Sequence, residues 1–177
     1  MNDKDKQPTS GFVSDIGDES DFNSTRHNGG FTNISEAYVS KSGFTRMFSA
    51  VRYGKRYMLK CLKPDFAYTP IYRQALMKEF EIGLQLDHPN ICRTISMEPV
   101  DELGDCIVME YVDGETLEAT VKGGNMTEDK VRKIASQLLD AMEYMHAKQT
   151  VHRDIKPSNI MLTHRGGDVK LIDFGLS

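Results

Sequence analysis

The segment that decides the fold of this chain is VHRDIKPSNIMLTHRGGDVKLIDFG, residues 151–175. Two short apolar stretches in it carry two carboxylates, Asp154 and Asp173, and one carboxamide, Asn159. A Gly-Gly pair lies between the stretches and favours a hairpin turn, because glycine adopts positive φ at little cost. Pairing of the two arms would bring Asn159 and Asp173 close together.

These three polar side chains are suited to a magnesium and phosphate site. Asp154 lies in a polar stretch between strand-like residues, where a carboxylate held by a rigid scaffold could accept a proton from a hydroxyl. Asn159 offers a neutral oxygen and Asp173 an anionic one, which suit a hard cation that also binds water and phosphate. Each residue alone would more often be a turn or cap residue, so the prediction depends on their order and spacing.

The same segment resembles the catalytic machinery of one family. Its HRDIKPSN is similar to the catalytic loop of eukaryotic-type serine/threonine protein kinases, and its DFG to their magnesium-binding motif. The resemblance implies that Asp154 accepts the proton of the substrate hydroxyl and that Asn159 and Asp173 hold Mg²⁺. It implies that Lys156, which is typical of serine/threonine kinases rather than tyrosine kinases, contacts the transferring phosphate. The implied function is ATP- and magnesium-dependent phosphoryl transfer to serine and threonine hydroxyls of proteins.

The resemblance extends over about residues 37–177 and implies a two-lobe, protein-kinase-like fold of the α+β class. Residues 31–112 would form the small N-lobe, with a five-stranded antiparallel sheet and helix C, and residues 113–177 part of the helical C-lobe. Residues 1–30 are rich in polar residues with isolated apolar ones, so we expect a disordered tail. The family pattern continues beyond DFG, so we expect the chain to be a fragment of a larger kinase.

The sequence SKSGFT occupies the position of the family's glycine-rich loop over the ATP phosphates. Ser40, Ser42 and Thr45 stand where the family carries glycine. Glycine lets the backbone approach a phosphate closely, so its replacement predicts weaker closure over ATP. Gly43 and Phe44 remain as the expected flexible tip of this loop.

Lys60 ends the apolar run YMLK, which resembles the strand that carries the ATP-binding lysine of the family. A lysine in an apolar strand is costly to bury, so it requires an anionic partner. Glu79, in the helix expected to begin at Pro70, is implied to be that partner. Glu81 competes, but it points about 200° around the helix from Glu79. Without Lys60, Glu79 would be read as a solvated surface charge.

Gly83 lies one turn beyond Glu79, where active kinases usually carry a large apolar residue that packs on the Phe of DFG. Glycine offers no side chain there and weakens the helix by roughly 1 kcal/mol. We therefore expect the active arrangement to require help from a partner or another segment.

The sequence MEYVDG, beginning at Met109, resembles the hinge between the two lobes. The resemblance implies that the Glu110 carbonyl and the Val112 amide bind adenine, with Met109 as the gatekeeping side chain and Met161 as a further cofactor-binding residue. The residues alone do not show this, because an ordinary core strand explains the apolar run equally well.

The remaining elements follow from periodicity and turn residues. Strands are expected at residues 46–52, 56–62, 93–97 and 105–109, and an amphipathic helix at 128–148. Thr127 is its expected N-cap. The predicted buried face of that helix is Val131, Ile134, Leu138, Met142 and Met145.

Composition excludes several other classes. The 177 residues carry a formal net charge of −4, which argues against a general nucleic-acid binder. No apolar run is long enough for a membrane span and the N-terminus is too polar for a secretory signal, so cytoplasm is the expected location. Cys61, Cys92 and Cys106 show no paired spacing and are expected to be reduced core residues.

Two other functions remain open at the level of sequence. The degenerate glycine loop and the missing substrate lobe are compatible with a non-catalytic nucleotide-binding or interaction module. A small-molecule kinase is a weaker third alternative, because Lys156 and Pro157 after the catalytic aspartate fit protein kinases better. On the kinase reading the partners are ATP and a protein substrate.

Overall fold

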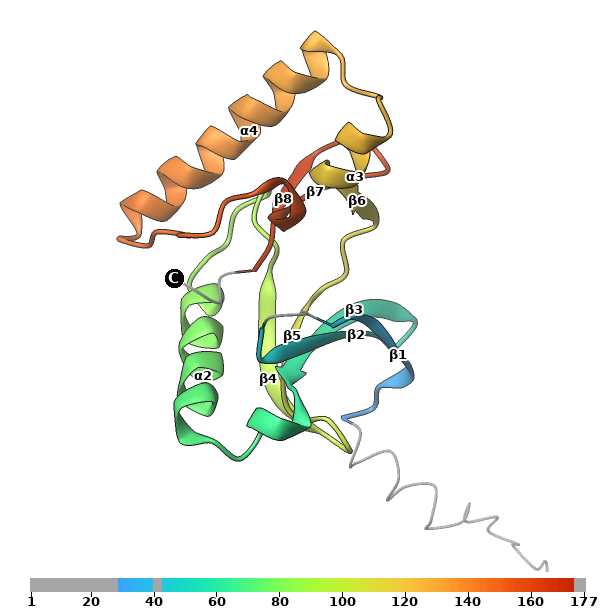
Figure 1. Cartoon of the computed structure of the whole chain (residues 1–177), viewed down its shortest axis with the longest axis vertical. Helices are drawn as coiled ribbons and strands as arrows, with labels where there is room; N and C mark the ends of the chain where they lie inside the picture. Colours follow the sequence, from blue (N-terminus) through green and yellow to red (C-terminus); the bar gives the residue numbers. More distant parts are fainter. Residues whose placement is uncertain (1–28, 40–42, 174–177) are drawn as a thin grey trace, which may run out of the picture.

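The computed structural model describes residues 29–39 and 43–173. The strands are β1 (Thr32–Val39), β2 (Thr45–Arg52), β3 (Lys55–Leu62), β4 (Thr94–Val100), β5 (Gly104–Glu110), β6 (Gly114–Thr116), β7 (Ile160–Thr163) and β8 (Val169–Leu171). The helices are α2 (Pro70–Leu84), α3 (Leu117–Lys122) and α4 (Glu128–Ala147), with 3₁₀ turns η1 (Pro64–Phe66) and η2 (Pro157–Asn159). Figure 1 shows β1 to β5, η1 and α2 in one half of the molecule and the remaining elements in the other.

The first half is built on an antiparallel sheet of five strands in the order β1-β2-β3-β5-β4. The β2–β3 hairpin turns at Tyr53 and Gly54, which both have positive φ (50° and 73°), as a tight hairpin requires. β4 and β5 extend further than the sequence predicted, because residues 98–100 continue the ladder and only residues 101–103 form the turn. The predicted long connection between these strands is therefore wrong.

Helix α2 covers one face of this sheet. Pro70 is its first residue, where a missing N–H costs nothing, and its buried residues are Leu76, Glu79 and Gly83. Ile71 is 68% exposed, because it lies outside the helix face that carries Leu76, Glu79 and Gly83. Glu81 is exposed, so the choice of Glu79 as the inward-facing carboxylate is confirmed.

Gly83 brings α2 very close to β4. A Cβ atom added to Gly83 would lie 2.2 Å from Thr94 Oγ1 and 3.1 Å from Thr94 Cβ. Thr94 is itself buried, so its side chain already fills the space that a larger residue at position 83 would take. Gly83 and Thr94 are therefore complementary in size, because the threonine side chain fills the space that glycine leaves open.

The second half combines α4 with the small sheet β6-β7-β8. Thr127 caps α4 by accepting a hydrogen bond from the Lys130 amide, as predicted. Ile134 and Met145 are buried against β7 and β8, but Val131 is 49% exposed, so the predicted buried face is too wide. The sequence did not reveal β6 or α3, because strands and helices this short carry too few residues to show a period.

The segment after α2 joins the two halves. The Cys92 amide donates to the Leu171 carbonyl (2.9 Å), and the Leu171 amide donates to the Asn90 carbonyl (2.8 Å). The buried Asn90 side chain adds a third bond, from Nδ2 to the Val169 carbonyl (2.9 Å). β8 is therefore held directly against the segment that leads into β4. Within residues 29–39 and 43–173, no helix has the length and apolar character needed to cross a membrane.

Candidate functional site

The Lys60 ammonium group joins three separate parts of the chain. Lys60 lies on β3, and its Nζ donates to Glu79 Oε1 on α2 at 2.5 Å. The same nitrogen donates to Asp173 Oδ1, two residues beyond β8, at 2.8 Å. Lys60 and Glu79 are buried, whereas the Asp173 side chain is 47% exposed. The ion pair expected from the sequence is present, together with a second carboxylate.

These contacts keep Lys60 charged in spite of its burial. Burial alone would lower the pKa of the ammonium group, but the attraction of Glu79 and Asp173 outweighs it, so the pKa of Lys60 is raised. A lysine in this state is a permanent cation at the junction of β3, α2 and β8.

A second cluster surrounds the Asp154 carboxylate. Lys156 Nζ donates to Asp154 Oδ2 at 2.7 Å, and Asn159 Nδ2 donates to the same oxygen at 2.9 Å. Asn159 Nδ2 also donates to the Asp154 main-chain carbonyl at 2.9 Å, which fixes the loop between the two residues. Three residues singled out in the sequence therefore lie in direct contact. The carboxylate is oriented by two donors, as a group positioned to receive a proton requires.

His152 holds this loop through hydrogen bonds of its ring, which the sequence motif alone did not reveal. It is buried, and its Nε2 lies 3.0 Å from the Ile172 carbonyl. Its Nδ1 accepts from the Asp154 amide at 3.3 Å, so the proton belongs on Nε2, which donates to Ile172. Burial lowers the pKa of the imidazole, which keeps it neutral. His152 thus ties the loop that carries Asp154 to the residue before Asp173.

The two predicted magnesium ligands are brought together by the β7–β8 hairpin. The Ile172 amide donates to the Asn159 carbonyl at 3.0 Å, so Asp173 follows directly on a residue bonded to Asn159. Asn159 uses Nδ2 for Asp154, which leaves Oδ1 as its candidate ligand atom. An exposed carboxylate and an amide oxygen fit Mg²⁺ that completes its shell with phosphates. Among the residues that the structure describes, no group of three His, Cys, Asp or Glu forms a metal site by itself.

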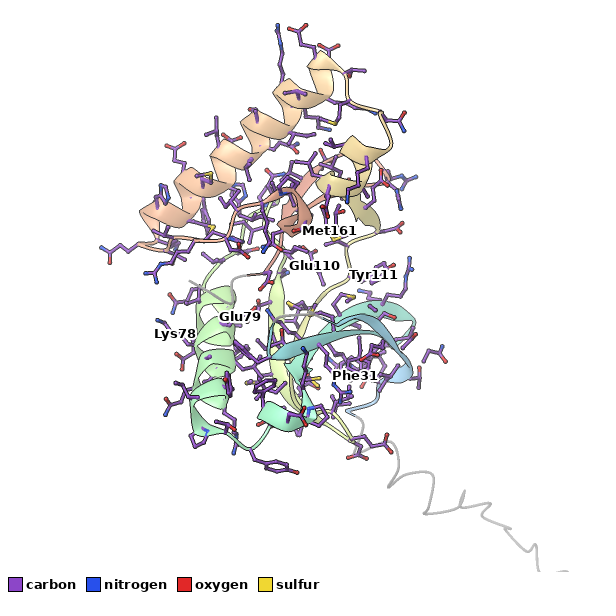
Figure 2. The ribbon with its side chains drawn as sticks, in the orientation of Figure 1. Phe31, Lys78, Glu79, Glu110, Tyr111 and Met161 are labelled. Atoms are coloured by element: carbon purple, nitrogen blue, oxygen red, sulfur yellow. The ribbon has the colours of Figure 1, made fainter. Side chains whose placement is uncertain are left out.

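The predicted hinge segment lies where the two halves of the molecule meet, and in the view of Figure 2 the labelled Glu110, Tyr111 and Met161 lie at this level. The Glu110 side chain accepts from Lys170 Nζ on β8 (2.7 Å) and from the Arg93 amide (3.0 Å). Met109 pairs with Met58 on β3, and Val112 is buried. The sequence assigned only main-chain groups to Glu110, so its side-chain bridge between β5 and β8 was missed.

Part of the predicted phosphate loop lies outside the described residues, namely Ser40 and Ser42. Thr45 pairs with Leu62 at the start of β2, and Gly43 is half-buried. Phe44 does not project freely, contrary to expectation. Its ring lies 5.0 Å from that of Tyr72 on α2, and its carbonyl accepts from the Lys63 amide at 2.9 Å. The residue packs on α2 because an aromatic surface is available there.

Comparisons with known proteins agree with this geometry. The family model described as "Protein kinase domain" matches residues 41–177. Mitogen-activated protein kinase kinase 9 of Arabidopsis thaliana is 43% identical over 124 residues, which cover 68% of this chain and 38% of that protein. A probable serine/threonine-protein kinase of Streptomyces coelicolor is 34% identical over 145 residues, covering 78% of this chain and 21% of the relative.

A third relative, serine/threonine-protein kinase 36 of Pongo abelii, is 34% identical over 141 residues, covering 78% of this chain and 10% of the relative. The chain therefore spans well under half the length of these three relatives.

Proposed function

The chain belongs to the protein kinase domain family, and on that premise we propose that it transfers the γ-phosphoryl group of ATP to serine and threonine hydroxyls of proteins. The observation that carries the proposal is the double contact of Lys60 with Glu79 and Asp173. It assembles a buried cation and an exposed carboxylate at one place, as binding of a magnesium-bound polyphosphate requires.

In this proposal Lys60 binds the α- and β-phosphates of ATP, and Glu79 holds the ammonium group in position. Glu79 is suited to that task because it is buried on a helix that the Gly83 contact fixes against the sheet. Adenine would lie where the two halves meet, at the level of Glu110 and Met161 in Figure 2. Met109 and the main chain of Glu110 and Val112 would bind it from β5 and the residues that follow. Ser40, Ser42, Gly43, Phe44 and Thr45 form the loop assigned to the phosphates.

Asp154 is proposed to orient the substrate hydroxyl and accept its proton. Asn159 and Lys156 direct the Asp154 carboxylate, and Lys156, which is half-exposed, can turn toward the transferring phosphate. Asn159 and Asp173 would hold Mg²⁺, which neutralises the charge on the phosphates. The neutral His152 keeps the loop and the Ile172 carbonyl together throughout.

An assay of phosphoryl transfer with magnesium-ATP and mixed peptides tests the proposal. Asp154→Asn should lower kcat about 10²- to 10⁴-fold, since it removes the proton acceptor and keeps the shape. Asp140→Asn, an exposed aspartate on α4, is the matched control and should leave kcat unchanged. Serine and threonine peptides should be phosphorylated and tyrosine peptides should not.

The same assay distinguishes a kinase from a non-catalytic nucleotide-binding module. Turnover that survives Asp154→Asn would contradict the assigned role of Asp154. ATP binding by the wild-type chain without any turnover would instead favour a non-catalytic nucleotide-binding module.

A further inference from the structure

A groove of about 800 Å³ lies away from the Lys60 and Asp154 clusters, at the end of the sheet where η1, α2 and the β4–β5 turn meet. Its walls include Leu62, Leu76, Met77, Met97 and Val100. The apolar character continues to the surface, because Met77 is 45% exposed. Nothing in the proposed phosphoryl transfer uses this groove.

The groove also contains two cations. Arg46 and Arg73 line it, and Arg46 Nε is the one buried side-chain nitrogen without a hydrogen-bond partner among the residues that the structure describes. Arg73 pairs with Asp105 at 3.6 Å, but both side chains are more than half exposed, so this contact is weak. A buried donor without a partner is costly, and a carboxylate oxygen would satisfy it after a small rotation of the side chain.

We infer that this groove binds the N-terminal segment of the same chain, residues 11–22. This segment leads into the described residues next to β4, a strand that lines the groove. Gly29 is the first residue described after that segment, and its carbonyl accepts from Arg52 Nη1, which also binds Glu98 on β4 at 2.7 Å. Pro99 and Val100, the next two residues of β4, line the groove.

The composition of the segment fits the groove. Phe12, Val13, Ile16 and Phe22 are the only large apolar residues between positions 8 and 28. In a helical conformation, residues four apart such as Phe12 and Ile16 share one face, as in peptides that dock helices into apolar grooves. Ile16 can lie up to about 45 Å from Gly29 in an extended chain, so the tether is long enough.

The order of charges agrees with this placement. Arg26, close to Gly29 in sequence, would pass the acidic turn residues Asp101 and Glu102 at the rim. Asp15 and its acidic neighbours, farther along the tether, would reach Arg46 and Arg73. Opposite charges therefore meet at both ends, which favours one direction of docking.

Disulfide trapping in the full chain tests the inference. One variant carries Ser14→Cys with Tyr68→Cys, and its control carries Ser14→Cys with Tyr53→Cys. Tyr68 lines the groove and Tyr53, on the β2–β3 turn, does not, yet both are 91% exposed, so their accessibility is matched. The native cysteines are buried and do not compete. Effective concentrations of the two thiols are measured in a glutathione buffer.

We expect an effective concentration at least about tenfold higher for the Tyr68 pair than for the Tyr53 pair. Adding Phe12→Ser and Ile16→Ser should remove the excess, because the apolar anchors are lost. Equal values for the two pairs, or an excess that survives loss of the anchors, would overturn the inference. A disulfide between two chains would do so as well, since it would assign the groove to a second copy. The measurement involves no phosphoryl transfer, so its result is independent of the proposed function.

Discussion

Lys60 is the single residue on which the site depends most, because its ammonium group joins β3, α2 and the residue after β8. Lys60→Met should destabilise the chain by about 3 kcal/mol, since it leaves Glu79 buried without a cation. The free energy of unfolding in urea measures this. In the double variant Lys60→Met with Glu79→Leu, most of the loss should be regained. A double variant as unstable as the single one would show that the buried charge is not the cause.

His152 gives the chain a dependence on pH. Burial lowers the pKa of the folded imidazole below about 6.5, so the unfolded chain takes up the proton first. The contribution of His152 to stability is thus present above pH 6.5 and is lost as pH falls through the folded pKa. The free energy of unfolding of the wild type should fall between pH 7.5 and 5.5, and His152→Gln should show a smaller fall.

The exposed His146 on α4 provides the control for this prediction. His146→Gln should keep the dependence of the wild type. An unchanged pH profile in His152→Gln would assign the dependence to other groups.

The sequence indicates contacts within the candidate site only where the residues lie close together along the chain. Asp154, Lys156 and Asn159 are in contact because they lie on one short loop, so their spacing already implied it. The second partner of Lys60, Asp173, lies 113 positions away, and only the fold brings it near. The side-chain bond of Glu110 to Lys170 was missed for the same reason.

Among the elements, α2 is positioned by its contact with β4 at Gly83. Gly83→Ala should gain about 1 kcal/mol of helix propensity but lose more, because the new Cβ would lie 2.2 Å from Thr94 Oγ1. We expect net destabilisation by about 1–2 kcal/mol and a raised KM for ATP, since α2 carries Glu79. Urea unfolding and steady-state kinetics check both.

Leu84→Ala, at the neighbouring exposed position, is the control for the helix and should change neither quantity much. Adding Thr94→Ala to Gly83→Ala should restore part of the stability, because it removes the hydroxyl that lies 2.2 Å from the new Cβ. The Cβ of residue 94, at 3.1 Å, would remain as a milder close contact. A stabilised Gly83→Ala variant would show that the helix can move away without loss.

Elements were predictable in proportion to their length. α4 begins at its predicted N-cap and ends one residue before the predicted limit, because a 20-residue helix shows its period clearly. β6 has three residues and exists only through its pairing with β7, so nothing local marks it. The exposure of Ile71 and Val131 depends on where the neighbouring elements lie, which periodicity does not state.

At the scale of the whole molecule, the two halves are joined by the segment around Asn90. Asn90→Ala removes the bond from Nδ2 to the Val169 carbonyl and leaves that buried carbonyl without it, at a cost of about 1–3 kcal/mol. Hydrogen exchange at residues 169–173 should rise more than exchange in the five-stranded sheet. The change should therefore loosen the junction between the halves before it loosens either half.

Asn125→Ala, at an exposed position before α4, is the matched control and should change stability by less than about 0.5 kcal/mol. A uniform rise in exchange over the whole chain after Asn90→Ala would contradict a local role at the junction.

The contact of Gly83 with Thr94 also restricts the order in which this chain can change through evolution. A larger residue at position 83 is acceptable only after Thr94 has become smaller, whereas a smaller residue at 94 can arise first at the cost of a cavity. The two positions are therefore epistatic, and one of the two mutational routes between the small and the large pair is closed. Lineages that carry a bulky residue at position 83 should have lost the threonine side chain first.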